Sequence, residues 1–514
     1  MQHLSSVRGH VAALPAGALL GLAFPAPSWW WLAWVGVVPL LLVVRAAPTA
    51  GQGALRAWAG MAAFVLTSQY WLWPSAGPLL VLLAAGLGAL WLPWGWAAHR
   101  LLSGRVDVRG VLAAVVVLPC AWVIAEAARS WDRLGGPWAL LGASQWNSPA
   151  TLAPASVGGV WLVSFLLVAA NTAIVGTVLL RSIRVAALFA AAVAVGPLWC
   201  WLGPAAADQP AVRVALVQPG DITDATARQR ASEALTEGLA GQHVDLVVWG
   251  ESSVGVDLDG RPDVSARLAE LSGRVGADLL VNVDARTAAG GIYKSAVLIG
   301  PGGVRGTYAK TRLVPFGEYV PFRSLFGWAT RHTQAAAEDR RRGDGPVVLH
   351  TDRLAVGPLI SFEALFSDLP RQVVDLGADL LAYQSATSTY QGSRAQPQLA
   401  SVVAVHAVET GHPAVHAATS GVSSAFDADG HRLGWLPADE RGVAVVDVPL
   451  GSRTTGYQRF GDWLIVVALL TFTGWCARSA RRSWTGGPRW RAPNRAAARR
   501  WWTARRCRPP TGRP

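Results

Sequence analysis

The chain has 514 residues, of which 52% are hydrophobic and only 15% are charged. Soluble globular domains carry about 25% charged residues, so this balance excludes an ordinary soluble enzyme and points to membrane spans. The formal charge of +13 does not indicate nucleic acid as a partner, because twelve arginines and no acidic residue lie between Arg478 and Arg513 and leave the remainder nearly neutral.

Long apolar runs divide the chain into regions. They fill residues 11–203, are absent from 204 to 459, and return at 463–477. Because about 20 apolar residues cross the hydrocarbon core of a bilayer, the sequence predicts eight spans, near 11–24, 28–44, 57–73, 77–97, 110–128, 158–180, 185–203 and 463–477. The predicted domains are a seven-span bundle at 1–203, a water-facing domain at 204–459, an eighth span at 460–477 and a basic, disordered tail at 478–514.

The arginines near the predicted spans set the expected orientation. The N-terminal segment and the even-numbered loops hold Arg8, Arg45, Arg56, Arg100, Arg105, Arg109, Arg181 and Arg184, whereas the odd-numbered short loops hold only Arg129 and Arg133. The positive-inside rule then predicts a cytoplasmic N-terminus. Seven spans place the water-facing domain on the outer side of the membrane, and the eighth returns the arginine-rich tail to the cytoplasm, beside anionic lipid headgroups.

The water-facing domain shows an α/β pattern between residues 212 and 450. Short β-rich runs such as VRVALVQ, VDLVVWGES, KSAVLIG, LAVGPLISFE and ADLLAYQS alternate with amphipathic segments near 223–240, 262–275 and 396–410. Several runs are continuously apolar, as expected for strands that are covered on both faces. The pattern predicts an α/β sandwich.

Polar residues follow three of these runs, at the edge where open α/β folds build their sites. They are Glu251, Lys310 with Glu318 shortly after it, and Ser361 with Glu363. The 45 lysine and arginine residues include only two lysines, Lys294 and Lys310. A lysine in such a chain suggests a need for a compact ammonium rather than a planar guanidinium. We assign that need to Lys310 and expect Lys294 to be an ordinary surface residue.

These residues resemble a known family, the bacterial apolipoprotein N-acyltransferases, whose outer domain belongs to the nitrilase (carbon-nitrogen hydrolase) superfamily. The resemblance rests on GGPWALLGASQ at 135–145, VALVQPG at the start of the domain, LVPFGEYVP at 313–321 after a lysine, and the final return span. It implies a multi-pass α-helical bundle in the bacterial cell membrane that carries a nitrilase-like α-β-β-α sandwich.

The resemblance also implies roles and partners. Glu251 matches the general base, Lys310 the oxyanion-stabilising residue and Ser361 the nucleophile, and the supporting positions are Glu318, Phe362 and Glu363. The implied acyl donor is a phospholipid and the acceptor is a diacylglyceryl-modified lipoprotein. No cofactor, metal or nucleic acid is expected.

The sequence departs from the family pattern around the nucleophile. Ser361 stands where the family has a cysteine, and Cys120, Cys200, Cys476 and Cys507 all lie outside the domain. Phe362 replaces a tyrosine, Gly250 replaces a proline, and residues 385–393 lack the usual Asn-Asn-Ala-Trp-Phe run. Three functions therefore stay open: an N-acyltransferase that uses Ser361 through an oxygen ester, a weak or inactive relative that binds lipoproteins or partner enzymes, and a membrane-anchored nitrilase-type amidase or other acyltransferase.

Overall fold

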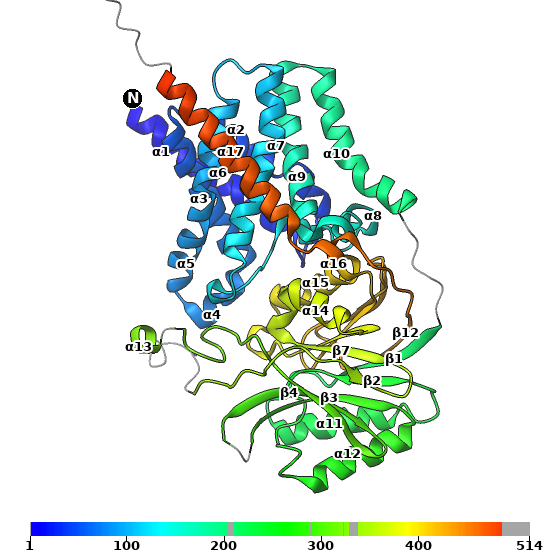
Figure 1. The fold of residues 1–514 in the computed structure, drawn as a ribbon. Helices are drawn as coiled ribbons and strands as arrows, with labels where there is room; N and C mark the ends of the chain where they lie inside the picture. Colours follow the sequence, from blue (N-terminus) through cyan, green and yellow to red (C-terminus); the bar gives the residue numbers. More distant parts are fainter. Residues whose placement is uncertain (1, 204–209, 288–289, 322, 328–337, 486–514) are drawn as a thin grey trace, which may run out of the picture. The chain divides into compact units, whose positions relative to one another are not determined.

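The computed structural model describes residues 2–203, 210–287, 290–321, 323–327 and 338–485. The chain divides into two compact units, Met1–Leu469 and Leu470–Pro514. The first unit contains a helical bundle and an α/β domain (Figure 1). Within the second unit the described residues are helical as far as Thr485, past the predicted span end at 477. The rest of the predicted tail, 486–514, lies outside the described residues.

The bundle is built from helices of unequal length. Its elements are α1 (Gln2–Ala18), α2 (Val37–Arg45), α3 (Ala50–Ser68), α4 (Trp73–Ala76), α5 (Leu79–Gly88), α6 (Leu92–Leu102), α7 (Val108–Arg129), α8 (Pro149–Leu152), α9 (Ala155–Leu180) and α10 (Ile183–Leu202). Close approach of α1 to α3 depends on glycine, since a Cβ on Gly17 would lie 1.8 Å from the Gly60 carbonyl oxygen. Such small-residue contacts are typical of helices that pack within membranes.

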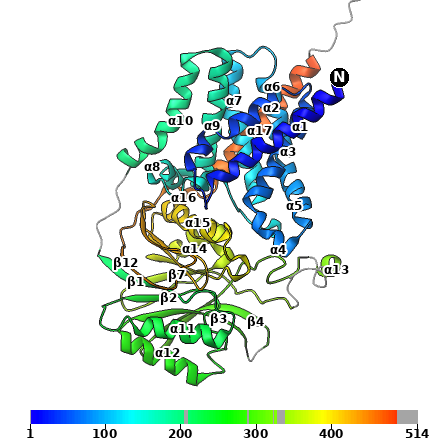
Figure 2. The same cartoon turned by 180° about the vertical axis from the view of Figure 1, so that it is seen from behind.

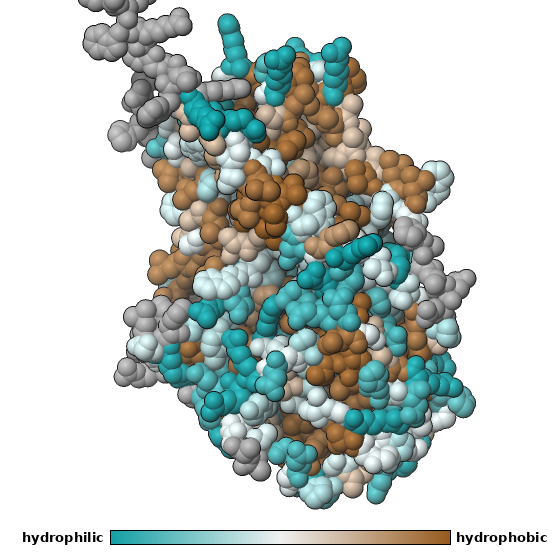
Figure 3. All heavy atoms as spheres, in the orientation of Figure 1, coloured by the Kyte–Doolittle hydropathy of each residue, from teal (hydrophilic) through white to brown (hydrophobic). Residues whose placement is uncertain are grey.

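The predicted count of eight spans is not confirmed. Among the described residues, five helical stretches are long and apolar enough to cross a membrane: Leu79–Leu102, Val108–Arg129, Ala155–Leu180, Ile183–Leu202 and Trp463–Arg481. The stretch Trp30–Arg45 is apolar but shorter. On the face drawn in Figure 3, hydrophobic residues gather over the helical part and hydrophilic residues over much of the α/β domain. The chain is a membrane protein.

The α/β domain contains two six-stranded sheets with their helices outside, which agrees with the predicted α-β-β-α sandwich. The first sheet has the order β12-β1-β2-β3-β4-β5 and the second β11-β10-β9-β8-β7-β6. The strands are β1 (Ala211–Gln218), β2 (Leu246–Trp249), β3 (Asp278–Arg286), β4 (Ile292–Gly300), β5 (Gly303–Ala309), β6 (Leu349–His350), β7 (Ala355–Ile360), β8 (Leu380–Ser385), β9 (Ala414–Ala418), β10 (Ser423–Phe426), β11 (Arg432–Leu436) and β12 (Gly442–Pro449).

Apolar side chains from both sheets form one core between them. Val214, Leu246 and Leu280 from the first sheet meet Val356 and Leu380 from the second, and all are fully buried. On the outer face of the first sheet lie α11 (Ala225–Glu237) and α12 (Pro262–Val275), as the view from behind shows (Figure 2). The central strands are therefore covered on both faces, which explains their continuous apolar runs.

Helix α15 (Ala395–Thr410) lies between the second sheet and the bundle, with α14 (Asp368–Asp375) beside it (Figure 1). Nearly all of its residues are buried, because the bundle covers the face that would otherwise meet water. Two polar side chains connect it to the bundle: Gln398 Nε2 donates to the Ser68 carbonyl oxygen at 3.2 Å, and Glu409 Oε1 accepts from Val160 N at 2.8 Å. These bonds fix α15 against α3 and α9 of the bundle.

Candidate active site

The carboxyl ends of strands from both sheets meet at one edge of the sandwich. A buried amide network joins them, since Gln384 Nε2 donates to the Trp249 carbonyl oxygen at 2.9 Å and Asn282 Nδ2 donates to Gln384 Oε1 at 3.2 Å. Glu251, just after β2, donates its backbone N–H to the Ser385 carbonyl oxygen at 3.0 Å. Ile360 pairs with Gln384 in the parallel register of β7 and β8. Ser361 and Ser385 therefore follow paired positions on neighbouring strands.

Glu251, Lys310 and Glu318 lie together behind this edge. Lys310 Nζ is 2.9 Å from Glu318 Oε1 and 3.4 Å from Glu251 Oε1. Lys310 has no exposed side-chain surface, and both carboxylates are almost as deeply buried. The other Glu251 oxygen, Oε2, accepts from Ala386 N at 3.0 Å. Three residues predicted as part of a site, one after β2 and two after β5, are thus brought into one buried ion cluster.

Lys294 belongs to the same cluster, so its predicted role as a surface lysine is wrong. Its Nζ lies 2.7 Å from Glu251 Oε1 and 3.3 Å from Glu318 Oε1, and its side chain is only 12% exposed. Lys294 stands on β4 directly opposite Asp284 on β3. The pairing of a lysine with an acidic residue across two neighbouring strands, together with the scarcity of lysine in the chain, is the sequence signal that could have placed it here.

The charges of the cluster favour the ionised forms of Glu318 and Lys294. Burial alone would raise the pKa of the Glu318 carboxyl, but the ammonium groups of Lys310 and Lys294 outweigh burial and lower that pKa from 4.5 to about 2. Burial likewise opposes the charge on Lys294, yet the facing carboxylates of Glu251, Glu318 and Asp284 raise its pKa above the ordinary value. Opposite charges at these distances favour the charged forms of both partners.

Ser361 occupies a sharp turn at the end of β7. Its φ of 53° lies in the left-handed region, where a residue with a side chain costs about 1–3 kcal/mol and persists only when its surroundings hold it. Glu363 supplies that support: its Oε2 accepts from Ile360 N at 2.8 Å, and its Oε1 accepts from Thr311 N at 2.7 Å and from Arg312 N at 3.0 Å. Glu363 thus ties the turn to the segment that follows Lys310.

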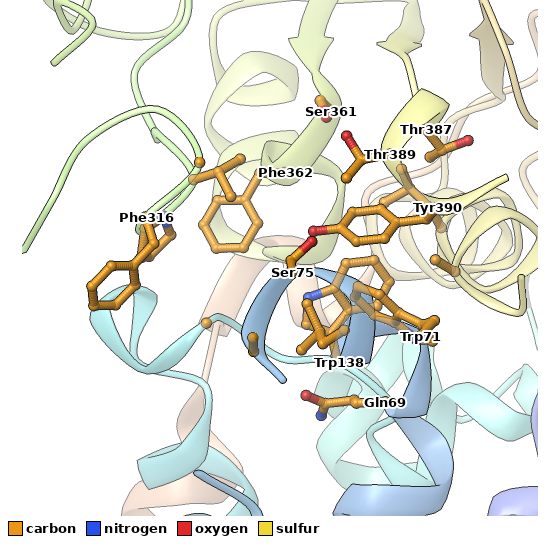
Figure 4. Close-up of a pocket in the computed structure, with 18 of the residues that line it drawn as sticks. Gln69, Trp71, Ser75, Trp138, Phe316, Ser361, Phe362, Thr387, Thr389 and Tyr390 are labelled. Carbon is orange, nitrogen blue, oxygen red and sulfur yellow. The ribbon is translucent and has the colours of Figure 1, made fainter. Parts of the chain in front are cut away.

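Ser361 also lines a cavity of about 570 Å³ between the bundle and the α/β domain. Most of the lining side chains are apolar or aromatic, and they include Trp71, Leu79, Leu83, Trp138, Val314, Phe316, Phe362, Tyr390 and Leu399. Figure 4 shows Ser361 and Phe362 on one side of this space and Trp71 and Trp138 on another. Leu79 and Leu83 belong to a helical stretch apolar enough to cross a membrane. A long hydrocarbon chain fits the chemistry of this lining.

The ion cluster is hydrogen-bonded to the backbone of two residues that line the cavity. Ala386 and Val314 line the cavity, and their backbone N–H groups bind Glu251 Oε2 and Glu318 Oε2 respectively. No hydrogen bond among the described residues joins the Ser361 hydroxyl to Glu251 or Lys310. Catalytic hydrogen bonds in proteins without substrate are often long and tighten only when substrate binds.

Two further departures from the family pattern have a local explanation. A Cβ on Gly250 would lie 2.0 Å from Thr419 N, and Thr419 Oγ1 donates to the Glu251 carbonyl oxygen at 2.7 Å, so glycine allows Glu251 and Thr419 to approach. Phe362 packs on Phe366 with ring centroids 5.0 Å apart and lies against Gly136 of the 135–145 loop. Among the described residues, no group of three or more His, Cys, Asp or Glu side chains could hold a metal ion.

Two successive parts of the chain each match a known protein family. Residues 16–173 match the apolipoprotein N-acyltransferase N-terminal domain, and residues 213–456 match the carbon-nitrogen hydrolase family. The chain is 29% identical to the apolipoprotein N-acyltransferase of Geobacter metallireducens, over 88% of this chain and 92% of that protein. It is 30% identical to the apolipoprotein N-acyltransferase of Azotobacter vinelandii, over 93% of this chain and 97% of that protein.

Among solved structures, a carbon-nitrogen hydrolase from Helicobacter pylori G27 matches with 18% identity and a TM-score of 0.37, covering 47% of this chain and 89% of that one.

Proposed function

The chain belongs to the apolipoprotein N-acyltransferase family, and from this membership we propose that Ser361 is the residue that carries the acyl group. The donor is a phospholipid, and the acceptor is the α-amine of the lipid-modified N-terminal cysteine of a lipoprotein. The observation that carries the proposal is the position of Ser361: it lines an apolar cavity bounded partly by α5, and two other lining residues, Ala386 and Val314, donate their backbone N–H groups to the Glu251 and Glu318 carboxylates of the buried cluster.

The first half-reaction forms an ester. The Glu251 carboxylate accepts the Ser361 hydroxyl proton while Oγ attacks the ester carbonyl carbon of the phospholipid. The negative charge that develops on the carbonyl oxygen is stabilised by the Lys310 ammonium and by backbone N–H groups. The bond to the glycerol oxygen then breaks, and the lysophospholipid leaves with the proton that Glu251 held. The enzyme retains the acyl chain as an oxygen ester on Ser361.

The second half-reaction forms an amide. The cysteine α-amine of the acceptor attacks the ester carbonyl, and Glu251 accepts the proton that the amine loses. Collapse of the tetrahedral intermediate breaks the bond to Ser361 Oγ, which takes the proton back from Glu251. The products are the N-acylated lipoprotein and the free Ser361 hydroxyl, so the site is ready for another donor.

A serine makes greater demands on this site than a cysteine would. A thiol ionises with a pKa of about 8.5 and can be held as a thiolate by a nearby cation, whereas an alcohol must lose its proton as the bond forms. The Ser361 reaction therefore needs a carboxylate that is ionised and free to accept a proton. A buried cluster with matched positive charges keeps carboxylates ionised in a site that excludes water.

The proposed orientation follows the arginine distribution. The α/β domain faces the outer side of the bacterial cell membrane, and the segment after the last span is cytoplasmic. Both substrates are anchored in lipid, and the cavity that Ser361 lines has bundle residues in its wall. An acyl chain can then enter the cavity from the outer leaflet without leaving an apolar environment.

The test is a search for the acyl-enzyme. Purified protein is incubated with phospholipid, and mass spectrometry of the peptide that contains Ser361 should find one acyl group on that residue. Ser361→Ala should lose both the adduct and transfer to a diacylated cysteine peptide, while Ser361→Cys should accelerate transfer. Peptide acylation by Ser361→Ala at the wild-type rate would remove Ser361 from its proposed role.

A further inference from the structure

Both lysines of a chain that otherwise uses arginine reach the same two carboxylates. Lys294 comes from β4 and Lys310 from the end of β5, and each Nζ lies within 3.5 Å of both Glu251 Oε1 and Glu318 Oε1, at 2.7 and 3.3 Å for Lys294 and 3.4 and 2.9 Å for Lys310. The family resemblance assigned a role to Lys310 alone. The geometry gives Lys294 the shorter contact with the proposed base.

The two lysines divide the two carboxylates between them. The shortest contact of Lys294 is to Glu251, and the shortest contact of Lys310 is to Glu318. The Glu251 carboxylate is thus held on one side by the Lys294 ammonium and on the other by Ala386 N. Lys310 makes only a long contact with Glu251, which leaves its remaining N–H capacity for another oxygen.

Charge balance in the cluster also depends on Lys294. The acidic side chains are Glu251, Glu318 and Asp284; the cations are Lys294, Lys310 and Arg340, which lies 3.1 Å from Asp284. Without Lys294, Lys310 would be the one cation within 4.0 Å of both buried glutamates among the described residues. An arginine would not replace it well, because a planar guanidinium cannot direct one compact charge at three carboxylates.

We infer that Lys294 is a positioning residue of the acyl-transfer reaction: its ammonium orients Glu251 toward the nucleophile and so leaves Lys310 to stabilise the substrate oxyanion. The inference rests on the proposed function, because Glu251 and Lys310 have these roles only in that reaction. A purely structural ion pair would contribute to stability but would leave the rate of acylation of the folded protein unchanged.

The test measures formation of the Ser361 ester in a single turnover, as a function of pH, in the full-length protein with phospholipid in detergent micelles. Lys294→Gln should lower the rate at neutral pH by roughly 10-fold or more and move the acid limb of the profile upward, since a carboxylate that loses a nearby cation binds its proton more tightly. The groups that face Glu251 are otherwise unchanged, namely Lys310, Glu318, Asp284 and Arg340.

A matched control removes a cation elsewhere on the adjoining strand. Arg305 on β5 pairs with Asp278 and Asp352, away from Glu251, so Arg305→Gln should keep the wild-type rate and acid limb. Lys294→Arg retains the charge but not the geometry, and it should keep the wild-type acid limb with a reduced rate. If Lys294→Gln does not fold, Lys294→Arg carries the test, and either a wild-type rate or a displaced limb overturns the inference.

The results separate this inference from the proposed function. Absence of an acyl group on wild-type Ser361 overturns the proposed function, whatever the Lys294 variants do. If the wild-type ester forms and Lys294→Gln forms it at the same rate with the same acid limb, only the role of Lys294 is lost.

Discussion

Two buried glutamates, Glu251 after β2 and Glu363 after β7, have opposite surroundings. Glu251 meets the ammonium groups of Lys294 and Lys310 and a single backbone N–H, from Ala386. Glu363 accepts five hydrogen bonds from neutral donors, namely Ile360 N, Thr311 N, Thr311 Oγ1, Arg312 N and the Tyr308 hydroxyl. Both carboxylates are buried, yet only one is surrounded by charges.

The difference separates reactivity from support. Four of the donors around Glu363 converge on Oε1 and the fifth, Ile360 N, binds Oε2, so both of its oxygens are tied to the backbone around the Ser361 turn. Glu251 has fewer donors, and two of them are the ammonium groups of Lys294 and Lys310. Glu251 is thus suited to accept a proton, and Glu363 to hold the Ser361 turn. Substituting the side chains that make this difference should therefore have distinct effects on rate and stability.

Glu251→Gln should have the largest effect on activity. An amide cannot accept the Ser361 proton, so the rate of acyl-enzyme formation should fall by about 10²–10⁴-fold, the usual contribution of a general base. The measurement is the single-turnover rate of Ser361 ester formation. Retention of more than a tenth of the wild-type rate would show that another group accepts the proton.

Lys310→Met should have the next largest effect. Loss of a single oxyanion donor costs about 2.7–4 kcal/mol in the transition state, or 10²–10³-fold in rate. Steady-state transfer to a diacylated peptide checks this, with thermal unfolding in detergent as the control for folding. An equal loss of rate in Lys294→Met would mean that the two lysines share one role instead of dividing it.

Glu363→Gln should affect stability first. The amide presents an NH₂ group where both carboxylate oxygens now accept, so one or more buried N–H donors lose their partner at a cost of about 1–3 kcal/mol each. The variant should unfold at a lower temperature, and its rate should fall because the Ser361 turn is no longer held. A wild-type unfolding temperature combined with a large loss of rate would make Glu363 a reacting group and end the contrast.

The sequence could locate Glu251, Lys310 and Ser361 after strands because each follows a recognisable strand run; their roles came from motif resemblance and stay a prediction. The prediction for Lys294 was wrong because it did not use the acidic residue on the neighbouring strand, Asp284. A segment far along the chain also lies beside β4 near Lys294, because Arg341 N donates to the Ile292 carbonyl oxygen. The local sequence pattern of β4 cannot predict a contact with a segment some 50 residues further along the chain.

In the helical part, too, the local sequence could not predict every feature of the structure. Hydropathy predicted whole spans at 11–24 and 28–44, whereas the structure has α1 followed by a 3₁₀ segment at Leu19–Ala23 and a second one at Trp30–Trp34 before α2. Helix α15 was expected to be amphipathic, but its outer face is buried because the bundle covers it. Hydrophobicity averaged over a window records how apolar a segment is, not what interrupts or covers it.

The smallest expected effect is the response of the ion cluster to acid. Glu318 has a pKa lowered from 4.5 to about 2 in the folded protein, so its contribution to stability is fully present above pH 4.5 and is lost as the pH falls through about 2. Unfolding temperatures of the wild-type protein should therefore decline across this window, and those of Glu318→Gln should decline less steeply. The two curves should run parallel between pH 6 and 8, where the carboxylate is ionised in both the folded and the unfolded protein. Equal slopes below pH 4.5 would show that the ammonium groups of Lys294 and Lys310 do not stabilise this carboxylate, and the cluster would then lose the charged character that distinguishes it from the surroundings of Glu363.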